Sequence, residues 1–237
     1  MDNKKINFTG EFFVPGATDE RIAKDHMERY KFAANYSSGK SVLDIACGVG
    51  YSSEIFIQNQ ALSYDGVDIN DELVEFASLN YKSNNVNYHL GDICKFDIKK
   101  QFDLITCFET IEHVEDYKGA IKNLYKLLNP GGKLLISSPN RIITSPNCNS
   151  LLDKPKNKYH CQEFIPKELI QSLIDNDFII NKQEDCLFGQ RQRHVVNNKF
   201  TKKLLKLFYG NPDNNTSPKV TLVTNKSPRY FILVASK

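Results

Sequence analysis

The residues best suited to bind a ligand follow short apolar runs of the sequence. The run 40–46 contains Asp44 and is followed by Gly48 and Gly50, and the next apolar run ends at Asp68. The two glycines allow the backbone to approach a ligand closely and to turn sharply into a helix. Asp68 stands 24 positions after Asp44, close to the offset of about 20 residues at which an acidic side chain accepts hydrogen bonds from ribose hydroxyls. This spacing indicates a nucleoside site.

A third apolar run, 86–90, is followed by two more candidate binding residues. Asp92 offers an acceptor for the amino group of adenine, and Ile93 offers an apolar surface for its ring. A G-x-G sequence alone is weak evidence, because ordinary strand-to-helix turns also contain it. The three features together favour an adenosine ligand.

Strand-like and helix-like segments alternate through most of the chain, and these elements must position the candidate residues. Periodicity predicts strands at 40–46, 63–67, 86–90, 102–108, 133–137, 178–187 and 230–235, and helices at 18–34, 51–58, 70–81, 117–128 and 166–176. Short apolar strands that alternate with helices imply a parallel sheet covered on both faces. In such a sheet, ligands bind beyond the carboxyl ends of the strands.

Length and composition set the class of protein. The chain has 237 residues, of which 41% are apolar and 25% charged, as expected for one globular domain. No apolar run is long enough for a membrane span or a signal peptide, so we expect a cytoplasmic protein without a membrane partner. The six cysteines form no C-x-x-C pair, which supports neither a disulfide framework nor a metal site. A net charge of +3 does not by itself indicate a nucleic-acid partner.

The expected organisation is a single domain with two additions. Residues 1–36 form an N-terminal helical lid, and residues 37–187 and 229–237 form the core. Residues 188–228 are polar, rich in Asn, Lys and Pro, and poor in strand signal, with one helix expected at 199–209. We interpret them as a basic insertion before the last strand.

Five segments, in order and spacing, resemble the motif series of class I S-adenosylmethionine-dependent methyltransferases. They are V-L-D-I-A-C-G-V-G-Y, G-V-D-I, G-D-I, F-D-L-I-T-C-F-E-T-I-E-H-V and L-N-P-G-G-K-L-L-I-S-S-P-N, all within residues 40–140. The resemblance implies a Rossmann-like α/β fold with a seven-stranded, mostly parallel sheet. Its last strand, 230–235, would be antiparallel beside the fifth. S-adenosylmethionine is the cofactor that the resemblance implies.

The same resemblance places the cofactor contacts on this sequence. Asp44 and the loop after it would hold the amino-acid end of the cofactor, Asp68 the ribose, and Asp92 the adenine. The expected cofactor-binding residues are Tyr30, Asp44, Ala46, Gly48, Gly50, Asp68, Ile69, Asp92, Ile93 and Phe108. For Tyr30, on the first helix, a packed core face is an equally good interpretation.

Two other classes of protein fit part of this pattern. A nicotinamide dehydrogenase requires G-x-G-x-x-G/A, but Ser53 stands at the third small position, and no substrate domain of comparable size follows. A non-catalytic subunit that keeps the cofactor fold stays open, because these motifs indicate binding rather than turnover.

The acceptor is expected to be a small polar molecule. Enzymes of this class that methylate nucleic-acid amino groups usually carry N/D/S-P-P-Y/F after the fourth strand, where this chain reads C-F-E-T. The segments around residues 15–33 and 157–169 resemble methyltransferases of bacterial glycan and capsule biosynthesis. A hydroxyl of an activated sugar is therefore the expected acceptor, and N-methylation of an amino sugar or another small metabolite is the alternative. The sequence leaves open whether the chain forms a homodimer.

A sugar hydroxyl must lose its proton during methyl transfer, so the site is expected to contain a base. Glu109, His113 and His160 are the expected catalytic residues, and Glu112 is a further candidate. Each histidine also has a structural interpretation, because His113 can cap the loop after the fourth strand and His160 can brace the loop before a helix.

The basic insertion offers a candidate substrate contact. Arg191 and Arg193 alternate as they would on one side of an extended segment, where they could bind the phosphates of a nucleotide-activated or otherwise phosphorylated acceptor. A solvated basic face is the plain alternative. A nucleic-acid surface is disfavoured because aromatic residues are not interleaved with the basic ones.

Overall fold

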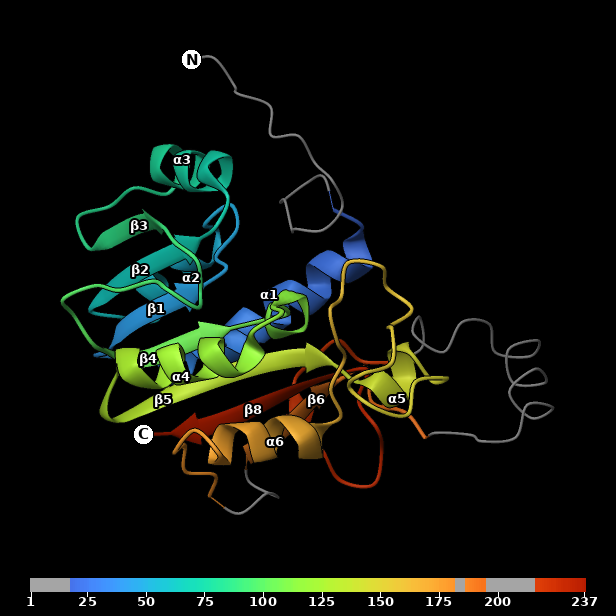
Figure 1. The fold of residues 1–237 in the computed structure, drawn as a ribbon. Helices are drawn as coiled ribbons and strands as arrows, with labels where there is room; N and C mark the ends of the chain where they lie inside the picture. The colour runs from blue at the N-terminus through green and yellow to red at the C-terminus, as the bar shows by residue number, and fades with distance from the viewer. Residues whose placement is uncertain (1–17, 182–185, 195–215) are drawn as a thin grey trace.

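The computed structural model describes residues 18–181, 186–194 and 216–237. They form an eight-stranded sheet in the order β3-β2-β1-β4-β5-β8-β6-β7 (Figure 1). The strands are β1 (Ser41–Ile45), β2 (Ser63–Asp68), β3 (Val86–Leu90), β4 (Phe102–Cys107), β5 (Leu128–Pro139), β6 (Leu187–Gln190), β7 (Thr221–Leu222) and β8 (Tyr230–Ser236). This is the Rossmann-like α/β fold predicted from the sequence, with eight strands instead of seven.

The helices cover both faces of the sheet, as the alternating pattern predicted. They are α1 (Glu20–Ala34), α2 (Ser52–Gln58), α3 (Asp71–Asn80), α4 (Tyr117–Leu127), α5 (Arg141–Thr144) and α6 (Pro166–Ile174), with a 3-10 turn η1 (Ile111–His113) after β4. One buried core joins α1, α2 and α3 to the sheet, and a second core joins α4 and α6 to its other face (Figure 1). The side chain of Asn70 caps α3 by accepting hydrogen bonds from the N–H groups of Glu72 and Leu73, as expected.

The strand order reverses beside β1. The chain runs from β1 through β2 to β3 and then returns to β4 on the other side of β1, so Asp44 lies between Gly66 of β2 and Thr106 of β4. Strands β1 to β5 are parallel neighbours, and their carboxyl ends lie at one edge. Ligands of open α/β sheets bind at such a reversal.

The last strand was predicted correctly, whereas the strand predicted before it lies partly outside the described residues. β8 pairs antiparallel with β5, with Leu135 opposite Val234. Of the predicted strand at 178–187, residues 182–185 lie outside the described residues, while Ile179 makes an isolated antiparallel bridge with Ser236 and Leu187 begins β6. β6 is set by its antiparallel pairing with β8 and by the packing of Phe188 on Phe32 of α1, with ring centroids 4.6 Å apart.

Part of the predicted organisation lies outside the described residues. This applies to the start of the lid, residues 1–17, and to the helix expected at 199–209. The described part of the insertion contains the end of β6 and the two residues of β7, so it contributes strands to the sheet. Among the described helices, none has the length and apolar character to cross a membrane.

Candidate functional site

The loop after β1 combines strained backbone with close packing. Ala46, Gly48 and Gly50 all have positive φ, at 58°, 57° and 83°. A Cβ on Gly50 would come within 2.7 Å of the Cβ of Ala77 and 2.8 Å of Tyr88, so glycine is required there. A Cβ on Gly48 would meet nothing within 4 Å. The backbone of Gly48 therefore faces open space, and Ala46 beside it is exposed.

Asp68 joins this loop to the loop after β2. Its Oδ2 accepts a hydrogen bond from the N–H of Gly48 at 2.8 Å, and its Oδ1 accepts one from the N–H of Asn70 at 3.0 Å. Burial raises the pKa of Asp68. Each carboxylate oxygen can accept a second hydrogen bond, such as one from a ribose hydroxyl. Ile69 is 73% exposed beside it and offers an apolar surface.

The residues after β3 divide between surface and core. Asp92 is partly exposed, and its Oδ1 accepts a hydrogen bond from the N–H of Cys94 at 2.8 Å. Ile93 packs in the core on the α4 side, and its carbonyl oxygen accepts a hydrogen bond from the amide of Asn123. Asp92 is thus placed at the strand end as predicted, whereas the side chain of Ile93 is buried.

Asp44 is completely buried and is held by four hydroxyl groups. Its oxygens accept hydrogen bonds from the side chains of Tyr30 at 3.2 Å, Ser52 at 2.6 Å, Tyr64 at 3.0 Å and Thr106 at 2.7 Å. Burial raises the pKa of Asp44 to about 6. Asp44 is therefore a positioning residue, which ties α1, α2, β2 and β4 together at the end of β1. Tyr30, the expected cofactor residue on α1, also packs on Phe108, with ring centroids 5.2 Å apart.

Glu109 follows β4 in a strained conformation. Its φ is +50°, in the left-handed region that residues other than glycine seldom adopt. The N–H of Glu109 donates to Ser137 Oγ at 3.0 Å, and the Ser137 hydroxyl donates to Oε1 of Glu109 at 2.7 Å. Nη1 of the buried Arg29 lies 3.5 Å from the same oxygen. These contacts hold the Glu109 carboxylate at the carboxyl edge of the sheet.

Sequence reasoning did not single out Arg29. Its Nε donates to Oε1 of Gln190 on β6 at 3.0 Å, and its guanidinium lies over the ring of Tyr230 on β8, 5.3 Å from the centroid. Only its position on the buried face of the predicted helix 18–34 could have indicated it. Arg29 connects α1, the end of β4 and the far strands of the sheet.

The structure brings His113 and His160 together from two distant segments. Their rings are perpendicular, with centroids 4.7 Å apart. Nδ1 of His113 lies 3.1 Å from the carbonyl oxygen of Tyr159. His160 lies between Oε1 of Glu163, 2.8 Å from its Nδ1, and the amide of Asn157, 2.9 Å from its Nε2.

Glu112 completes this group of side chains. Its residue is 1% exposed, and burial, with the neighbouring negative charge of Glu109, raises the pKa of its carboxyl well above the usual range. Ligand atoms of Glu112, His113 and His160 lie within 4.8 Å of one another. No spacing pattern in the sequence indicated this grouping.

The two arginines of the insertion have different surroundings. Arg191 is 4% exposed, and its Nε donates to Oδ1 of Asp25 at 2.8 Å, while its Nη1 donates to the carbonyl oxygen of Thr216. Its φ of +53° interrupts an extended conformation. Arg193 is partly exposed and pairs through its backbone with Ser227. The guanidinium of Arg191 is therefore already paired inside the protein.

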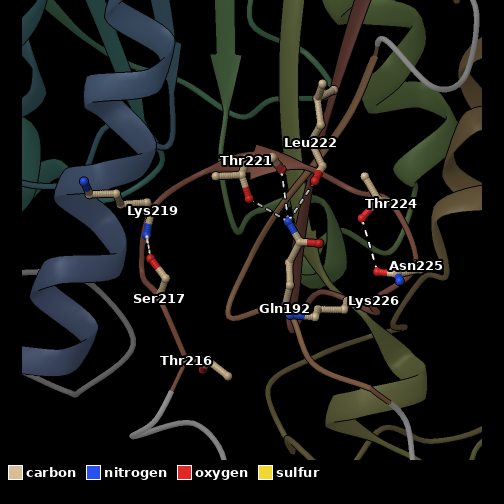
Figure 2. Close-up of a pocket in the computed structure, with 9 residues that line it drawn as sticks. All are labelled: Gln192, Thr216, Ser217, Lys219, Thr221, Leu222, Thr224, Asn225 and Lys226. Carbon is tan, nitrogen blue, oxygen red and sulfur yellow. Dashed lines mark hydrogen bonds between the residues drawn. The ribbon is translucent and has the colours of Figure 1, made fainter.

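A hollow of about 390 Å³ lies in the described part of the insertion (Figure 2). Its wall is polar and includes two lysines, Lys219 and Lys226. The amide of Gln192 donates to the carbonyl and hydroxyl oxygens of Thr221 and to the carbonyl of Leu222, which fixes one side of the hollow (Figure 2).

The chain is similar to known proteins over most of its length. Residues 19–181 match a family model described as a methyltransferase domain. A probable S-adenosylmethionine-dependent methyltransferase of Mycolicibacterium smegmatis is 29% identical over 184 residues, which are 77% of this chain and 68% of that protein. A ubiquinone biosynthesis O-methyltransferase of Coxiella burnetii is 38% identical over 145 residues, which are 56% of this chain and 61% of that protein. The match thus spans less than two thirds of the Coxiella protein.

Solved structures share the fold. The N-methyltransferase NodS from Bradyrhizobium japonicum, in complex with S-adenosyl-L-homocysteine, superposes with a TM-score of 0.60 over 92% of this chain and 88% of its own. The two sequences are 15% identical. This likeness concerns the architecture of the sheet and its helices.

Proposed function

Because the chain belongs to the methyltransferase-domain family, we propose that it transfers a methyl group from S-adenosylmethionine to a hydroxyl of a small polar acceptor. An activated sugar or a related surface-glycan precursor is the acceptor that we favour. Membership in the family confirms the predicted methyltransferase class, and the dehydrogenase alternative is set aside.

The carboxyl edge of the sheet fits S-adenosylmethionine. The Gly48 backbone faces open space, and Asp68 has lone pairs for the ribose hydroxyls. The exposed Ile69 can cover an apolar ring. When bound, this cofactor supplies an electrophilic methyl group on a sulfonium. The residues of the chain align the acceptor and exclude water, which are the main demands of an in-line displacement.

The position of the Glu109 carboxylate is the observation that supports a hydroxyl as the acceptor. A hydroxyl nucleophile needs a proton acceptor, and Ser137 and Arg29 hold the Glu109 carboxylate at the end of β4. We assign Glu109 as the base. His113 and His160 then lie on the acceptor side, where they orient the acceptor.

The insertion supports a phosphorylated acceptor. Arg193 is partly exposed, and Lys219 and Lys226 line the hollow beside its backbone partner Ser227. Charge-assisted hydrogen bonds from such cations suit a phosphate or diphosphate. Arg191 would contribute by holding the segment against α1 through Asp25.

A phenolic hydroxyl is the second candidate acceptor. The similarity to a ubiquinone biosynthesis O-methyltransferase favours it, and it would use the same base. An amine acceptor is a third class, suggested by the fold that the chain shares with NodS.

A screen for products tests the proposal. The full chain is incubated with S-adenosylmethionine and, separately, with nucleotide-activated sugars, catechol-type quinone precursors and amino sugars, and products are identified by mass spectrometry. We expect O-methylation of a nucleotide-activated sugar, and loss of turnover in Glu109→Gln with cofactor binding retained. Methylation of only a catechol or only an amine would replace the proposed acceptor.

A further inference from the structure

We propose that Glu112, His113 and His160 bind a divalent transition-metal cation. Glu112 and His113 belong to η1, and His160 lies in the loop before α6. Each residue offers one ligand atom, and these atoms lie within 4.8 Å of one another. The sequence supported no metal site. It could not indicate this one, because His113 and His160 are 47 positions apart in the sequence.

Glu112 provides a second, independent observation. Its residue is 1% exposed, and its Oε2 is buried with no hydrogen-bond partner among the residues that the structure describes. A buried carboxylate oxygen without a partner is costly unless a cation or a proton compensates it. The guanidinium of Arg29 makes its ion pair with Glu109. Glu112 therefore offers a buried carboxylate oxygen that a cation can satisfy.

The imidazoles are oriented as metal-binding histidines usually are. The contact between Nδ1 of His113 and the Tyr159 carbonyl favours a proton on Nδ1, which leaves the lone pair on Nε2. In the same way, the N–H at Nδ1 of His160 donates a hydrogen bond to Oε1 of Glu163. Carboxylates and carbonyls commonly fix metal-bound histidines in this manner. The cation would replace the single hydrogen bond that Nε2 of His160 accepts from Asn157.

Hydrogen bonds from the side chain of Gln162 and from the backbone of Cys161 hold the two segments in place without a metal. The amide of Gln162 donates to the carbonyl oxygens of Ile111 and Val114, at 2.9 and 3.0 Å. The N–H of Cys161 donates to the carbonyl of Glu112 at 2.8 Å. The loop that carries His160 is thus fixed against the turn that carries the other two ligands, and little ordering remains for the cation to impose.

The ligand set selects the type of cation. Two imidazole nitrogens and one carboxylate suit Mn²⁺, Co²⁺ or Zn²⁺ better than Mg²⁺ or Ca²⁺, which prefer oxygen ligands. Three protein ligands leave a coordination position for a water or for the acceptor oxygen, as in catalytic metal sites.

The role of the cation, unlike its binding, rests on the proposed function. A hydroxyl bound to the cation loses its proton more readily, and the Glu109 carboxylate would take that proton. The oxygen then forms the new bond to the methyl carbon, while the bond from sulfur to that carbon breaks and sulfur keeps the electron pair. Charge and atoms balance without any further reactant.

Metal binding by the full chain tests the site directly. The purified protein is stripped with a chelator, dialysed and titrated with MnCl₂, and free Mn²⁺ is counted by electron paramagnetic resonance. We expect one tightly bound Mn²⁺ per chain and much weaker binding of Mg²⁺. Glu112→Gln and His113→Asn should each weaken Mn²⁺ binding at least about tenfold.

Two control variants keep the result interpretable. His89→Asn removes a histidine that pairs with Asp65 on β2, and Cys161→Ser removes a neighbouring thiol; neither should change Mn²⁺ affinity. Thermal denaturation shows that each variant is folded, and His113, which is exposed, is the least disruptive ligand to replace. Absence of Mn²⁺ binding by the wild type, or equal binding by Glu112→Gln, would overturn the proposal.

Cofactor binding separates this proposal from the function. Calorimetry with S-adenosylmethionine should give the same affinity in Glu112→Gln as in the wild type. A wild type that binds the cofactor but no Mn²⁺ would remove the metal site and leave the methyltransferase in place. A wild type that binds Mn²⁺ but no cofactor would keep the metal site and remove the proposed methyltransferase function.

Discussion

The carboxylate of Asp68 accepts a hydrogen bond from the backbone N–H of Gly48 at 2.8 Å. One end of β2 thereby fixes the glycine loop after β1, across the boundary between two adjacent parallel strands. A single side chain orders the loop and presents acceptor oxygens at the same edge. Loop geometry and cofactor affinity should therefore change together when Asp68 is altered.

Asp68→Ala should weaken S-adenosylmethionine binding by about 1 to 3 kcal/mol, because it removes acceptors for the ribose and frees the Gly48 loop. Titration calorimetry measures the affinity, and thermal denaturation checks the fold. Asp71→Ala, which alters an exposed acid in the first turn of α3, is the matched control. Unchanged affinity in a folded Asp68→Ala protein would remove the ribose assignment.

Gly48→Ala and Gly50→Ala should separate the effect of the glycine loop on cofactor affinity from its effect on stability. An alanine at Gly50 would collide with Ala77 and Tyr88, so we expect a loss of stability of at least about 1 to 3 kcal/mol. At Gly48 the added methyl group meets open space, so stability should fall by only about 1 kcal/mol for the positive φ, while cofactor affinity decreases.

Gly131→Ala is the control for these two variants. Its φ is +78° and its Cβ would also meet nothing within 4 Å, but it lies at the start of β5. It should share the small loss of stability and keep full cofactor affinity. If Gly48→Ala behaves in the same way as Gly131→Ala, the Gly48 backbone does not face the cofactor.

Asp44 should make stability depend on pH between about 4 and 6. Its pKa is about 6 in the folded protein against 3.8 as the reference value, so the folded state holds the proton more tightly than the unfolded state. The stabilisation is present below pH 4 and is lost as pH rises through 6. At 1.36 kcal/mol per unit, the loss is about 3 kcal/mol.

Urea unfolding of the wild type and Asp44→Asn from pH 4 to 7 measures this effect. The unfolding free energy of the wild type, relative to the variant, should fall with rising pH, because asparagine does not titrate. A difference that stays constant, or that grows with pH, would show that the four hydroxyl groups keep the pKa of the Asp44 carboxyl near or below its reference value.

Arg191→Ala should change the stability of the protein, whereas Arg193→Ala should change its affinity for a phosphorylated acceptor. Arg191→Ala leaves the buried Asp25 without the closer of its two ion-pair partners, so we expect a loss of stability of about 3 to 5 kcal/mol. Arg193→Ala should keep stability and cofactor affinity but raise the Michaelis constant of a phosphorylated acceptor at least about tenfold, which is about 1.4 kcal/mol. Unfolding curves and steady-state kinetics measure the two effects. Unchanged kinetics in Arg193→Ala would leave the basic insertion as a solvated face.

The sequence by itself determined the parallel part of the fold and the edge that carries the candidate cofactor residues. Strands β1 to β4, the Asn70 cap and the placement of Asp68 at the end of β2 were all predictable. The reason is physical, since apolar periodicity and residues at strand ends act over a few positions of chain. Residues that follow parallel strands must meet at one edge, so local patterns were enough to predict the edge at which a ligand would bind.

Only the tertiary structure decided which distant side chains share an environment. Asp44 accepts a hydrogen bond from Thr106, 62 positions away, and Arg191 pairs with Asp25 across 166 positions. The grouping of His160 with Glu112 and His113 likewise depends on a loop clamped to η1 by Gln162. Local periodicity carries no information about such pairs, because burial and strand pairing of the whole sheet choose them. The edge that holds the candidate cofactor residues was therefore predictable, whereas the surroundings of the candidate catalytic residues depended on the completed fold.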